Sequence, residues 1–335
     1  MKPLLHRIKR QLGSVVHSDR FIRILDVVLS PFTLAAAALL AFLRRLPLAS
    51  LPTTRRVFTK VGVFPVRDHY YEPSFLERQG GEHRDLPGLD LAVDDQLALL
   101  DSFSFQDELR AFPTEGAAQH RGAFYYSNGM FESGDAECLY SLIRHFSPSM
   151  VMEIGSGHST LMAHAALTKN LSQGAPPAVH ICVEPYSAPW LEEIPDTKII
   201  RERVETLDPA RFDELSNNDI LFIDSSHMIR PNGDVLFEYL QVLPRLRPGV
   251  IVHVHDIFTP YDYPRKWREL GGRMWNEQYL LEALLSDSDR YRVLLGLNLL
   301  AQDHPQALKR AFPVYASHGE GRSLGSFWFQ VAPAT

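Results

Sequence analysis

The chain has 335 residues, 45% hydrophobic and 22% charged, which is typical of a globular protein and excludes a chain that is disordered throughout. Its formal net charge of -6 lacks the basic excess of a general nucleic-acid binder, so we expect no nucleic-acid partner. The two cysteines, Cys138 and Cys182, are too few for a disulfide framework or a zinc cluster, and a cytoplasmic environment is expected.

Residues 1–60 are predicted to attach the chain to a membrane. Residues 27–43 form a run of 17 uncharged residues. As a straight helix this run would measure roughly 26 Å, slightly less than a bilayer core of about 30 Å. Pro31 is expected to kink it. Basic residues lie on both sides, whereas a spanning helix usually has a charge difference between its flanks, so we predict a re-entrant or interfacial segment at the inner, cytoplasmic face.

Other structures remain open for residues 27–43. The run can span the membrane, or it can pack in a soluble core or between the subunits of an oligomer, because Ala-rich runs of this length also occur there. A cleaved signal peptide is disfavoured, since Arg44 and Arg45 follow the apolar run directly.

Residues 61–124 are predicted to form a connector and an N-terminal arm, rich in proline, arginine and acidic residues. Within the arm, the apolar residues of 94–109 have a spacing that predicts helical packing onto the following domain.

Strands and helices alternate over residues 125–335. The predicted strands are 151–154, 179–184, 198–200, 219–224, 250–255, 291–297 and 326–331. Several are apolar on both faces, as in a sheet that is covered by helices on both sides. We therefore predict a Rossmann-like, doubly wound α/β domain, in which ligands bind beyond the carboxyl ends of the strands where the strand order reverses.

A glycine turn follows the first of these strands, in the segment VMEIGSGHST at residues 151–160. Gly155 and Gly157 stand before a helix-compatible run, which is how nucleotide-binding α/β domains begin. A dinucleotide site needs a third small residue three positions after the second glycine, and the sequence here departs from that pattern. The missing third small residue counts against an NAD(P)-dependent oxidoreductase, which remains the alternative enzyme class.

Two acidic residues accompany the turn. Glu153 lies just ahead of it, where a carboxylate suits the ammonium group of an amino-acid moiety. Glu184 ends the next strand, where a carboxylate can accept hydrogen bonds from ribose hydroxyls. This order indicates S-adenosylmethionine as the cofactor, and we add Ser156 and Ser159 of the turn to the predicted cofactor-binding residues.

Four segments in series resemble the class I S-adenosylmethionine-dependent methyltransferases: VMEIGSGHST, CVEP, DILFIDSSH and LRPGVIVHVHDIF. They extend over roughly residues 125–331. The last two segments are most similar to the bacterial branch related to macrocin-type sugar O-methyltransferases. The resemblance implies a mostly parallel sheet with an antiparallel last strand, and transfer of a methyl group to an oxygen atom.

The resemblance also implies roles for residues after the fourth and fifth strands. Asp224 and Asp256 would bind Mg²⁺, Asp224 would also contact the cofactor, and His227 would be the general base. His255 stands where that branch tends to carry a second carboxylate, and Mg²⁺ prefers oxygen ligands, so the metal stays open. Without a metal, the two aspartates would be cofactor contacts or helix caps.

The acceptor is predicted to bind at Tyr261, Trp275 and Asn276, which offer aromatic and amide surface to a sugar or a similar polar molecule. Packing onto the edge of the sheet is the alternative for these side chains. We predict methylation of a hydroxyl on a glycan, a lipid-linked saccharide or a related small molecule. A membrane-bound scaffold that keeps the cofactor fold without turnover is the non-enzymatic alternative, and an oligomer is possible.

Overall fold

The computed structural model describes residues 19–43, 45–46, 51–61, 83–116, 122–186, 188–264, 275–319 and 321–333. The chain divides into two compact units, Met1–Glu77 and Arg78–Thr335. The division falls inside the predicted connector, so the C-terminal part of the connector belongs to the second unit.

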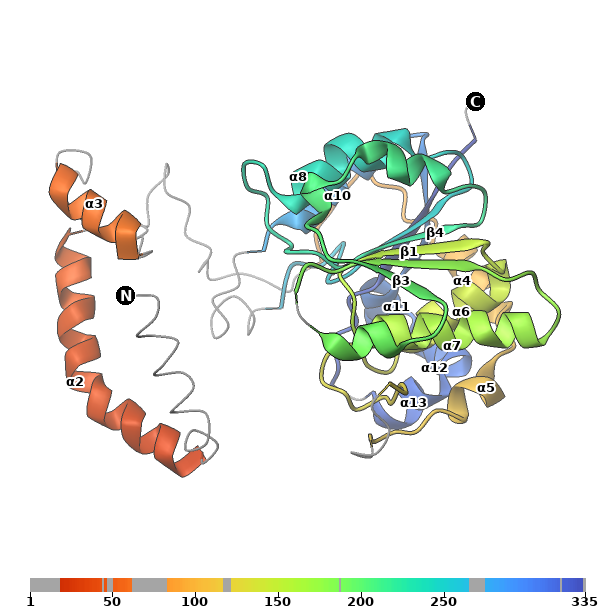
Figure 1. Cartoon of the computed structure of the whole chain (residues 1–335), viewed down its shortest axis with the longest axis horizontal. Coiled ribbons are helices and arrows are strands. Elements are labelled where there is room, and N and C mark those ends of the chain that lie inside the picture. Colours follow the sequence, from red (N-terminus) through yellow and green to blue (C-terminus); the bar gives the residue numbers. More distant parts are fainter. Residues whose placement is uncertain are drawn as a thin grey trace. The chain divides into compact units, whose positions relative to one another are not determined.

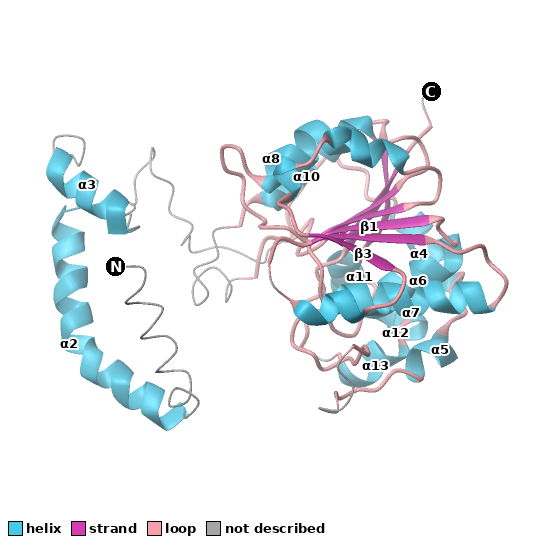
Figure 2. Cartoon of the chain, in the orientation of Figure 1, coloured by secondary structure: helices cyan, strands magenta, loops and turns pink. Residues whose placement is uncertain are grey.

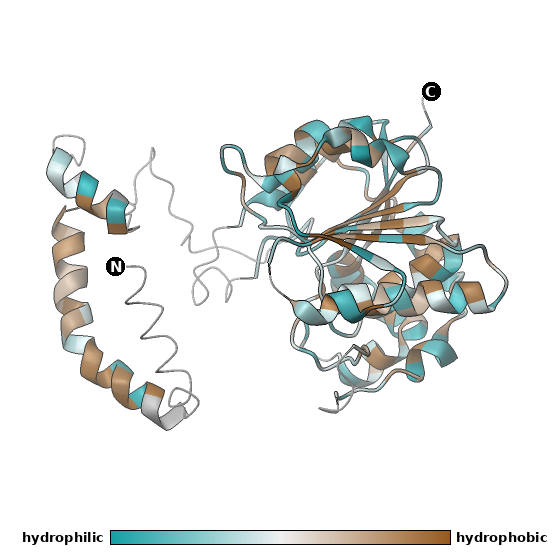
Figure 3. Cartoon of the chain, in the orientation of Figure 1, coloured by the Kyte–Doolittle hydropathy of each residue, from teal (hydrophilic) through white to brown (hydrophobic). Residues whose placement is uncertain are grey.

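The first unit contains a long helix, α2 (Asp19–Leu43), and a short helix, α3 (Pro52–Val61). Within α2, the 22 residues Ile22–Leu43 are 0% buried and apolar enough to cross a membrane, and Figure 3 shows α2 mostly in brown. A helix of that length measures roughly 33 Å, which exceeds a bilayer core of about 30 Å. The sequence analysis placed the apolar segment at residues 27–43, whereas the helix begins at Asp19 and its apolar part begins at Ile22.

Helix α2 continues through Pro31, where the sequence predicted a kink. Proline lacks the backbone N–H that would bond the carbonyl four residues earlier. That carbonyl belongs to Val27, and the Ser30 hydroxyl donates to it at 2.8 Å. Thr33 Oγ1 donates to the Leu29 carbonyl at 3.1 Å. Side-chain hydroxyls therefore satisfy carbonyls around the proline, which allows the helix to continue.

The second unit is built on a seven-stranded sheet with the order β3-β2-β1-β4-β5-β7-β6, drawn in magenta in Figure 2. The strands are β1 (Met150–Ile154), β2 (Val179–Val183), β3 (Thr197–Ile200), β4 (Ile220–Ile223), β5 (Ile251–Val254), β6 (Tyr291–Gly296) and β7 (Phe327–Val331). Strands β1 to β5 pair in parallel, whereas β7 is antiparallel to both β5 and β6. The predicted Rossmann-like fold with an antiparallel last strand is confirmed.

Helices cover both faces of the sheet (Figure 1). One face carries α4 (Val93–Asp101), α5 (Gln106–Arg110), α6 (Asp135–Phe146), α7 (His158–Ser172), α11 (Leu297–Asp303), α12 (Pro305–Ala311) and α13 (Pro313–His318). The other face carries α8 (Asp234–Phe237) and α10 (Glu277–Leu285). The two faces form separate apolar cores, and side chains of the strands alternate between them.

Some connections between the strands are short 3₁₀ helices. Two of these are η2 (Pro189–Glu193) and η4 (Pro209–Glu214). A further 3₁₀ turn is η3 (Val204–Thr206). Helix α8 continues as a π-helical turn, η5 (Glu238–Val242), which is followed by a 3₁₀ turn, η6 (Leu243–Arg245). In the arm, the segment 94–109 forms α4 and α5, and Leu100 and Leu109 are buried against the domain.

Candidate active site

The glycine turn brings the ends of three strands together. Gly155 has a φ of 80°, and a Cβ built on it would lie 2.0 Å from the backbone oxygen of Asp224. Its N–H donates to Val183 at the end of β2, and the Asp224 N–H donates to Ile154 at the end of β1. Glycine is therefore required at residue 155, both for the backbone conformation and for the close approach of β4.

A cavity of about 300 Å³ opens at this point, where the strand order reverses on either side of β1. Its walls comprise Ile154, Gly155, Val183, Glu184, Pro185, Tyr186, Arg203, Val204, Glu205, Asp224, Ser225, Ser226, Arg230 and Asp234. The predicted residues Gly155, Glu184 and Asp224 therefore lie together on one cavity. Glu184 also holds the turn, because Oε2 accepts from the Ser156 N–H at 3.2 Å.

Glu153 does not line this cavity. Its side chain is buried between the sheet and α7, where Oε1 lies 2.6 Å from His180 Nε2. Oε2 accepts from the hydroxyls of Ser159 and Thr160 at 2.9 and 3.1 Å. Strand alternation turns residue 153 into the core beneath α7, so the positions of Glu153 and Ser159 do not support their predicted contact with the cofactor. Gly157, also predicted, is not among the lining residues.

Sequence analysis missed four charged residues of this cavity. Arg203 Nη1 lies 3.6 Å from Glu205 Oε1, and Arg230 Nη2 lies 3.3 Å from Asp234 Oδ1. Asp234 also accepts from the backbone and the hydroxyl of Ser226, at 3.0 and 2.7 Å. These four residues could have been recognised from the sequence, because they follow β3 and β4 closely and ligands bind beyond the carboxyl ends of such strands.

Three predicted residues converge beside the cavity. His227 Nε2 lies 3.3 Å from Asp224 Oδ1 and 3.6 Å from Asp256 Oδ2. His227 and Asp256 have φ values of 58° and 57°, a left-handed conformation that is uncommon for residues other than glycine. Strained backbone of this kind concentrates at functional sites. The predicted neighbourhood of Asp224, His227 and Asp256 is therefore present in the structure.

The beginning of α10 holds His227 in place. The His227 carbonyl accepts from the N–H groups of Asn276 and Glu277, at 3.0 and 3.3 Å. His227 Nδ1 lies 2.9 Å from Glu277 Oε2, and both side chains are buried. The Trp275 ring lies 4.4 Å from the His227 ring between centroids. Sequence analysis missed Glu277, which stands 50 residues after His227.

The charges of the cluster shift the pKa values of its members. Burial lowers the pKa of His227, but contacts with Asp224 and Glu277 outweigh it and raise the pKa well above its usual value. Burial raises the pKa of Asp224, but His255 and His227 outweigh it and lower the pKa to about 2. Burial lowers the pKa of His255, whereas Asp256, Asp224 and Asp135 produce a net increase. The cluster thus stabilises positive charge among carboxylates.

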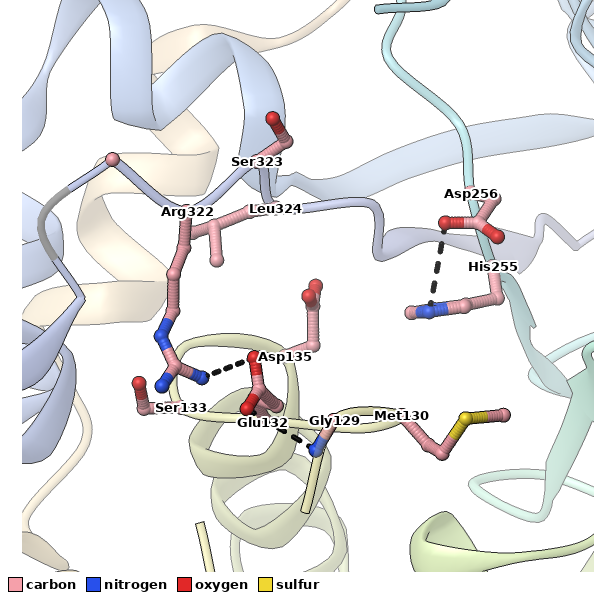
Figure 4. A pocket seen from close by; sticks show the side chains of 11 residues that line it. Gly129, Met130, Glu132, Ser133, Asp135, His255, Asp256, Arg322, Ser323 and Leu324 are labelled. Atoms are coloured by element: carbon pink, nitrogen blue, oxygen red, sulfur yellow. Dashed lines mark hydrogen bonds and ion pairs between the residues drawn. The ribbon is translucent and has the colours of Figure 1, made fainter. Parts of the chain in front are cut away.

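A second cavity, of about 430 Å³, opens on the Asp256 side of the cluster (Figure 4). Its walls comprise Gly129, Met130, Glu132, Ser133, Asp135, His255, Asp256, Gly321, Arg322, Ser323 and Leu324. Arg322 Nη1 lies 2.6 Å from Glu132 Oε2 across the cavity wall. The buried atoms Ser133 Oγ and His255 Nδ1 have no hydrogen-bond partner among the described residues. The wall therefore presents polar groups that a polar ligand can satisfy.

The predicted acceptor residues have other contacts. Tyr261 donates from its hydroxyl to Asp303 Oδ1 at 2.8 Å, and Asn276 Oδ1 accepts from the Ile229 N–H at 2.6 Å. Trp275 packs on His227. Tyr261, Trp275 and Asn276 line neither of the two cavities, so their predicted role in acceptor binding is not supported. Asn276 and Trp275 instead position the loop that carries His227.

The donor atoms at the cluster do not fit the Mg²⁺ that the resemblance implied. Asp224, His227 and Asp256 each offer one donor atom, and these atoms lie within 4.8 Å of one another. One donor is an imidazole nitrogen, and residue 255 is a second histidine. Mg²⁺ demands oxygen ligands in nearly ideal octahedral geometry. His253, two residues earlier on β5, is buried in the core, where its ring stacks on that of Phe222.

Comparisons with known proteins find one family and one relative for part of the sequence. The family described as "Methyltransferase domain" matches residues 152–257. Over 137 residues, 40% of the chain, the sequence is 28% identical to an uncharacterized protein of Archaeoglobus fulgidus. The match covers 61% of that relative, so the chain spans about three-fifths of its length.

Two solved structures are distantly similar. The plantazolicin methyltransferase BpumL is 11% identical, with 59% of this chain and 82% of that chain covered and a TM-score of 0.34. The O-methyltransferase TomG from Streptomyces achromogenes is 15% identical, with coverages of 70% and 90% and a TM-score of 0.32. Residues 152–257, which hold the glycine turn, the end of β1 and strands β2, β4 and β5, are therefore similar to a methyltransferase domain.

Proposed function

We propose that the chain transfers the methyl group of S-adenosylmethionine to a hydroxyl oxygen of a glycan, a lipid-linked saccharide or a related small molecule. The observation that carries the proposal is the meeting of two cavities at one cluster. Asp224 lines the cofactor cavity, Asp256 lines the second cavity, and His227 Nε2 lies within 3.6 Å of a carboxylate oxygen of each. The second cavity is therefore the proposed acceptor site.

The reaction makes modest demands on the protein, because the sulfonium methyl group is already activated. The C–S bond to the methyl group breaks as the bond to the acceptor oxygen forms, and S-adenosylhomocysteine leaves. The hydroxyl proton passes to the Asp256 carboxylate in the wall of the second cavity and from there to solvent. The chain has to align the oxygen with the methyl group, which two adjoining cavities on a rigid sheet edge can do, and to receive that proton.

The chemistry of the second cavity favours a hydroxyl-rich acceptor. The Glu132 and Asp256 carboxylates accept hydrogen bonds, whereas the Arg322 guanidinium donates them. A hydroxyl group can do both, so several hydroxyls on a compact frame match this wall. The cavity, about 430 Å³ in volume, lies within the usual range for small-molecule sites.

We further propose that α2 attaches the enzyme at the cytoplasmic membrane. Its apolar stretch Ile22–Leu43 is exposed along its length. Helix α3 follows it with basic residues that include Arg56 and Lys60, and with exposed Val57 and Val61. Such an amphipathic basic helix suits the surface of an anionic leaflet. The second unit would then lie at the inner face of the membrane, in contact with the S-adenosylmethionine of the cytoplasm.

A mass-spectrometric assay tests the proposed reaction. The full-length protein in detergent is incubated with S-adenosylmethionine and a panel of monosaccharides, nucleotide sugars and lipid-linked saccharides. We expect one acceptor to gain a single CH₂ unit, with equimolar S-adenosylhomocysteine. The control variant Asp256→Asn should bind S-adenosylhomocysteine and give little product. Methylation of a nitrogen or carbon atom instead of an oxygen would refute the proposed chemistry.

A further inference from the structure

We propose that the cluster of Asp224, His227 and Asp256 binds a divalent transition-metal ion such as Mn²⁺, Fe²⁺, Co²⁺ or Zn²⁺ in preference to Mg²⁺, with His227 Nε2 as a ligand. The inference rests on the proposed function only for the location of the site, because cation binding is measured without an acceptor. It replaces the role of His227 as a free base with a role as a metal ligand.

The spacing of the three donor atoms carries the first step. His227 Nε2 lies 3.3 and 3.6 Å from the two carboxylate oxygens, longer than a good hydrogen bond of about 2.7–3.2 Å. Metal bonds of about 2.0–2.2 Å that meet at roughly 90–110° separate neighbouring ligands by about 2.8–3.6 Å. The observed distances therefore correspond to ligands that face a shared cation.

The orientation of His227 carries the second step. A histidine that binds a metal through one ring nitrogen almost always donates the other N–H to a carboxylate or carbonyl group. In this chain His227 Nδ1 lies 2.9 Å from Glu277 Oε2, and the Glu277 side chain is fully buried. Glu277 thereby turns Nε2 toward the two aspartates, and a cation bound there would replace the proton that these carboxylates otherwise favour on this nitrogen. The arrangement is that of a carboxylate, histidine and metal triad.

The kind of donor decides which ion fits. An imidazole nitrogen is a favourable ligand for Zn²⁺, Fe²⁺ and related ions, whereas Mg²⁺ gains little from it. Two carboxylate oxygens and one imidazole nitrogen bind first-row dications well, and they leave positions open for water or an acceptor oxygen. The donor set therefore favours a transition metal.

A second group of possible ligands consists of Glu153, His180 and Cys182. We expect this group to bind no cation. Glu153 Oε1 and His180 Nε2 lie 2.6 Å apart, a direct hydrogen bond without space for a cation between them. The remaining Glu153 oxygen accepts from two hydroxyls. This group provides the control, because a metal bound there would have a thiolate ligand.

Titration with Co²⁺ tests the inference by visible absorption. The full-length protein in detergent is freed of metal with a chelator, and Co²⁺ is added to the wild type and to His227→Gln, Asp256→Asn, Glu277→Gln and Cys182→Ser. A thermal shift with S-adenosylhomocysteine checks that each variant is folded. We expect one Co²⁺ per wild-type chain, no thiolate-to-cobalt absorption, and no displacement by a large excess of Mg²⁺.

The variants separate the ligands from their support. His227→Gln and Asp256→Asn should weaken Co²⁺ binding by about tenfold or more, and Glu277→Gln by about 10–100-fold. Cys182→Ser should bind like the wild type.

Three results would overturn the inference. They are unchanged Co²⁺ binding by folded His227→Gln, a thiolate band that Cys182→Ser removes, and displacement of Co²⁺ by an equal concentration of Mg²⁺. The Mg²⁺ competition uses only the wild type. A chain that binds Co²⁺ as expected but methylates no hydroxyl would refute the proposed function alone.

Discussion

Glu277 Oε2 lies 2.9 Å from His227 Nδ1, joining the beginning of α10 to the loop after β4. The bond directs the opposite ring nitrogen toward Asp224 and Asp256. The geometry of the reacting end of the sheet therefore depends on a helix that follows the fifth strand, and on a buried carboxylate that touches neither cavity.

Replacing His227 should affect turnover and spare the cofactor. His227→Ala should lower the rate of methyl transfer by about a hundredfold or more, because its imidazole lies between the two aspartates where the cavities meet. Affinity for S-adenosylhomocysteine should stay near the wild-type value, because His227 does not line the cofactor cavity. Calorimetry and a product assay measure the two quantities. The exposed His318→Ala is the control, and full turnover in His227→Ala would remove the histidine from the mechanism.

Replacing Glu184 should weaken cofactor binding. Glu184 lines the cofactor cavity at the end of β2, where a carboxylate can accept from the ribose hydroxyls. Glu184→Ala should lose about 1.5–3 kcal/mol of binding free energy for S-adenosylhomocysteine, the range for hydrogen bonds to a charged group. Calorimetry measures the change, with the exposed Glu193→Ala as the control. Tight binding of NAD by the wild type, without heat from S-adenosylhomocysteine, would contradict the assignment of the cofactor.

The two glycines of the turn should respond differently to alanine. Gly155→Ala places a Cβ 2.0 Å from the Asp224 carbonyl on a backbone with a φ of 80°, so we expect a loss of about 2 kcal/mol or more of folding free energy. Gly157→Ala meets no atom within 4 Å and has extended backbone, so its stability should stay near wild type. Denaturant unfolding compares the two. Equal stability would show that the turn is not constrained by β4.

The stability of the catalytic unit should depend on Glu137. Its carboxylate accepts from the N–H groups of Gly134, Val314 and Tyr315. Burial nevertheless raises its pKa from 4.5 to about 7. Because the folded state holds the proton more tightly, the contribution of this group is fully present below pH 4.5 and is lost as the pH rises through about 7.

From pH 4 to pH 8 the loss amounts to about 3 kcal/mol, of which about 1.4 kcal/mol falls between pH 6 and pH 8. Unfolding in denaturant at pH 6 and pH 8 measures that second part. Glu137→Gln has no charge to bury, and its stability should fall less between these two values than that of the wild type. An identical change in both proteins would show that another group is responsible.

Removing the N-terminal unit should release the enzyme from the membrane. A chain that begins after residue 77 lacks α2 and α3 but keeps the second compact unit. We expect it in the soluble fraction, with S-adenosylhomocysteine still raising its melting temperature. Full-length protein that is soluble without detergent would contradict the proposed attachment. Protease treatment of sealed vesicles would show whether the two flanks of α2 lie on one side or on opposite sides.

The sequence predicted the sheet well because its strands are short apolar runs between turns, and buried parallel strands have few other interpretations. The glycine turn and Glu184 were recognisable because each stands at the end of a predicted strand, where ligands of such sheets bind. The three helices α11 to α13 were not predicted. Their residues, 297–318, contain His304, Pro305 and Pro313 between short apolar groups, so no long helical period is visible.

The site itself was only partly predictable. Asp224, His227 and Asp256 are close in space because β4 and β5 are neighbours in the sheet. Glu153 was predicted to bind the cofactor because it lies just ahead of the turn, but its place along the strand directs the side chain into the core. Arg322 and Glu132 lie far apart in the chain and meet only after folding, so no local pattern marks them as walls of one cavity.

Transfer of a labelled methyl group tests the central claim most directly. S-adenosylmethionine with a trideuterated methyl group is given to the wild-type enzyme with the acceptor found in the panel, and fragmentation of the product locates the label. We predict an intact CD₃ group on a hydroxyl oxygen, strongly reduced in Asp256→Asn and His227→Ala. A product without the label, or a labelled product formed equally by both variants, would contradict the account.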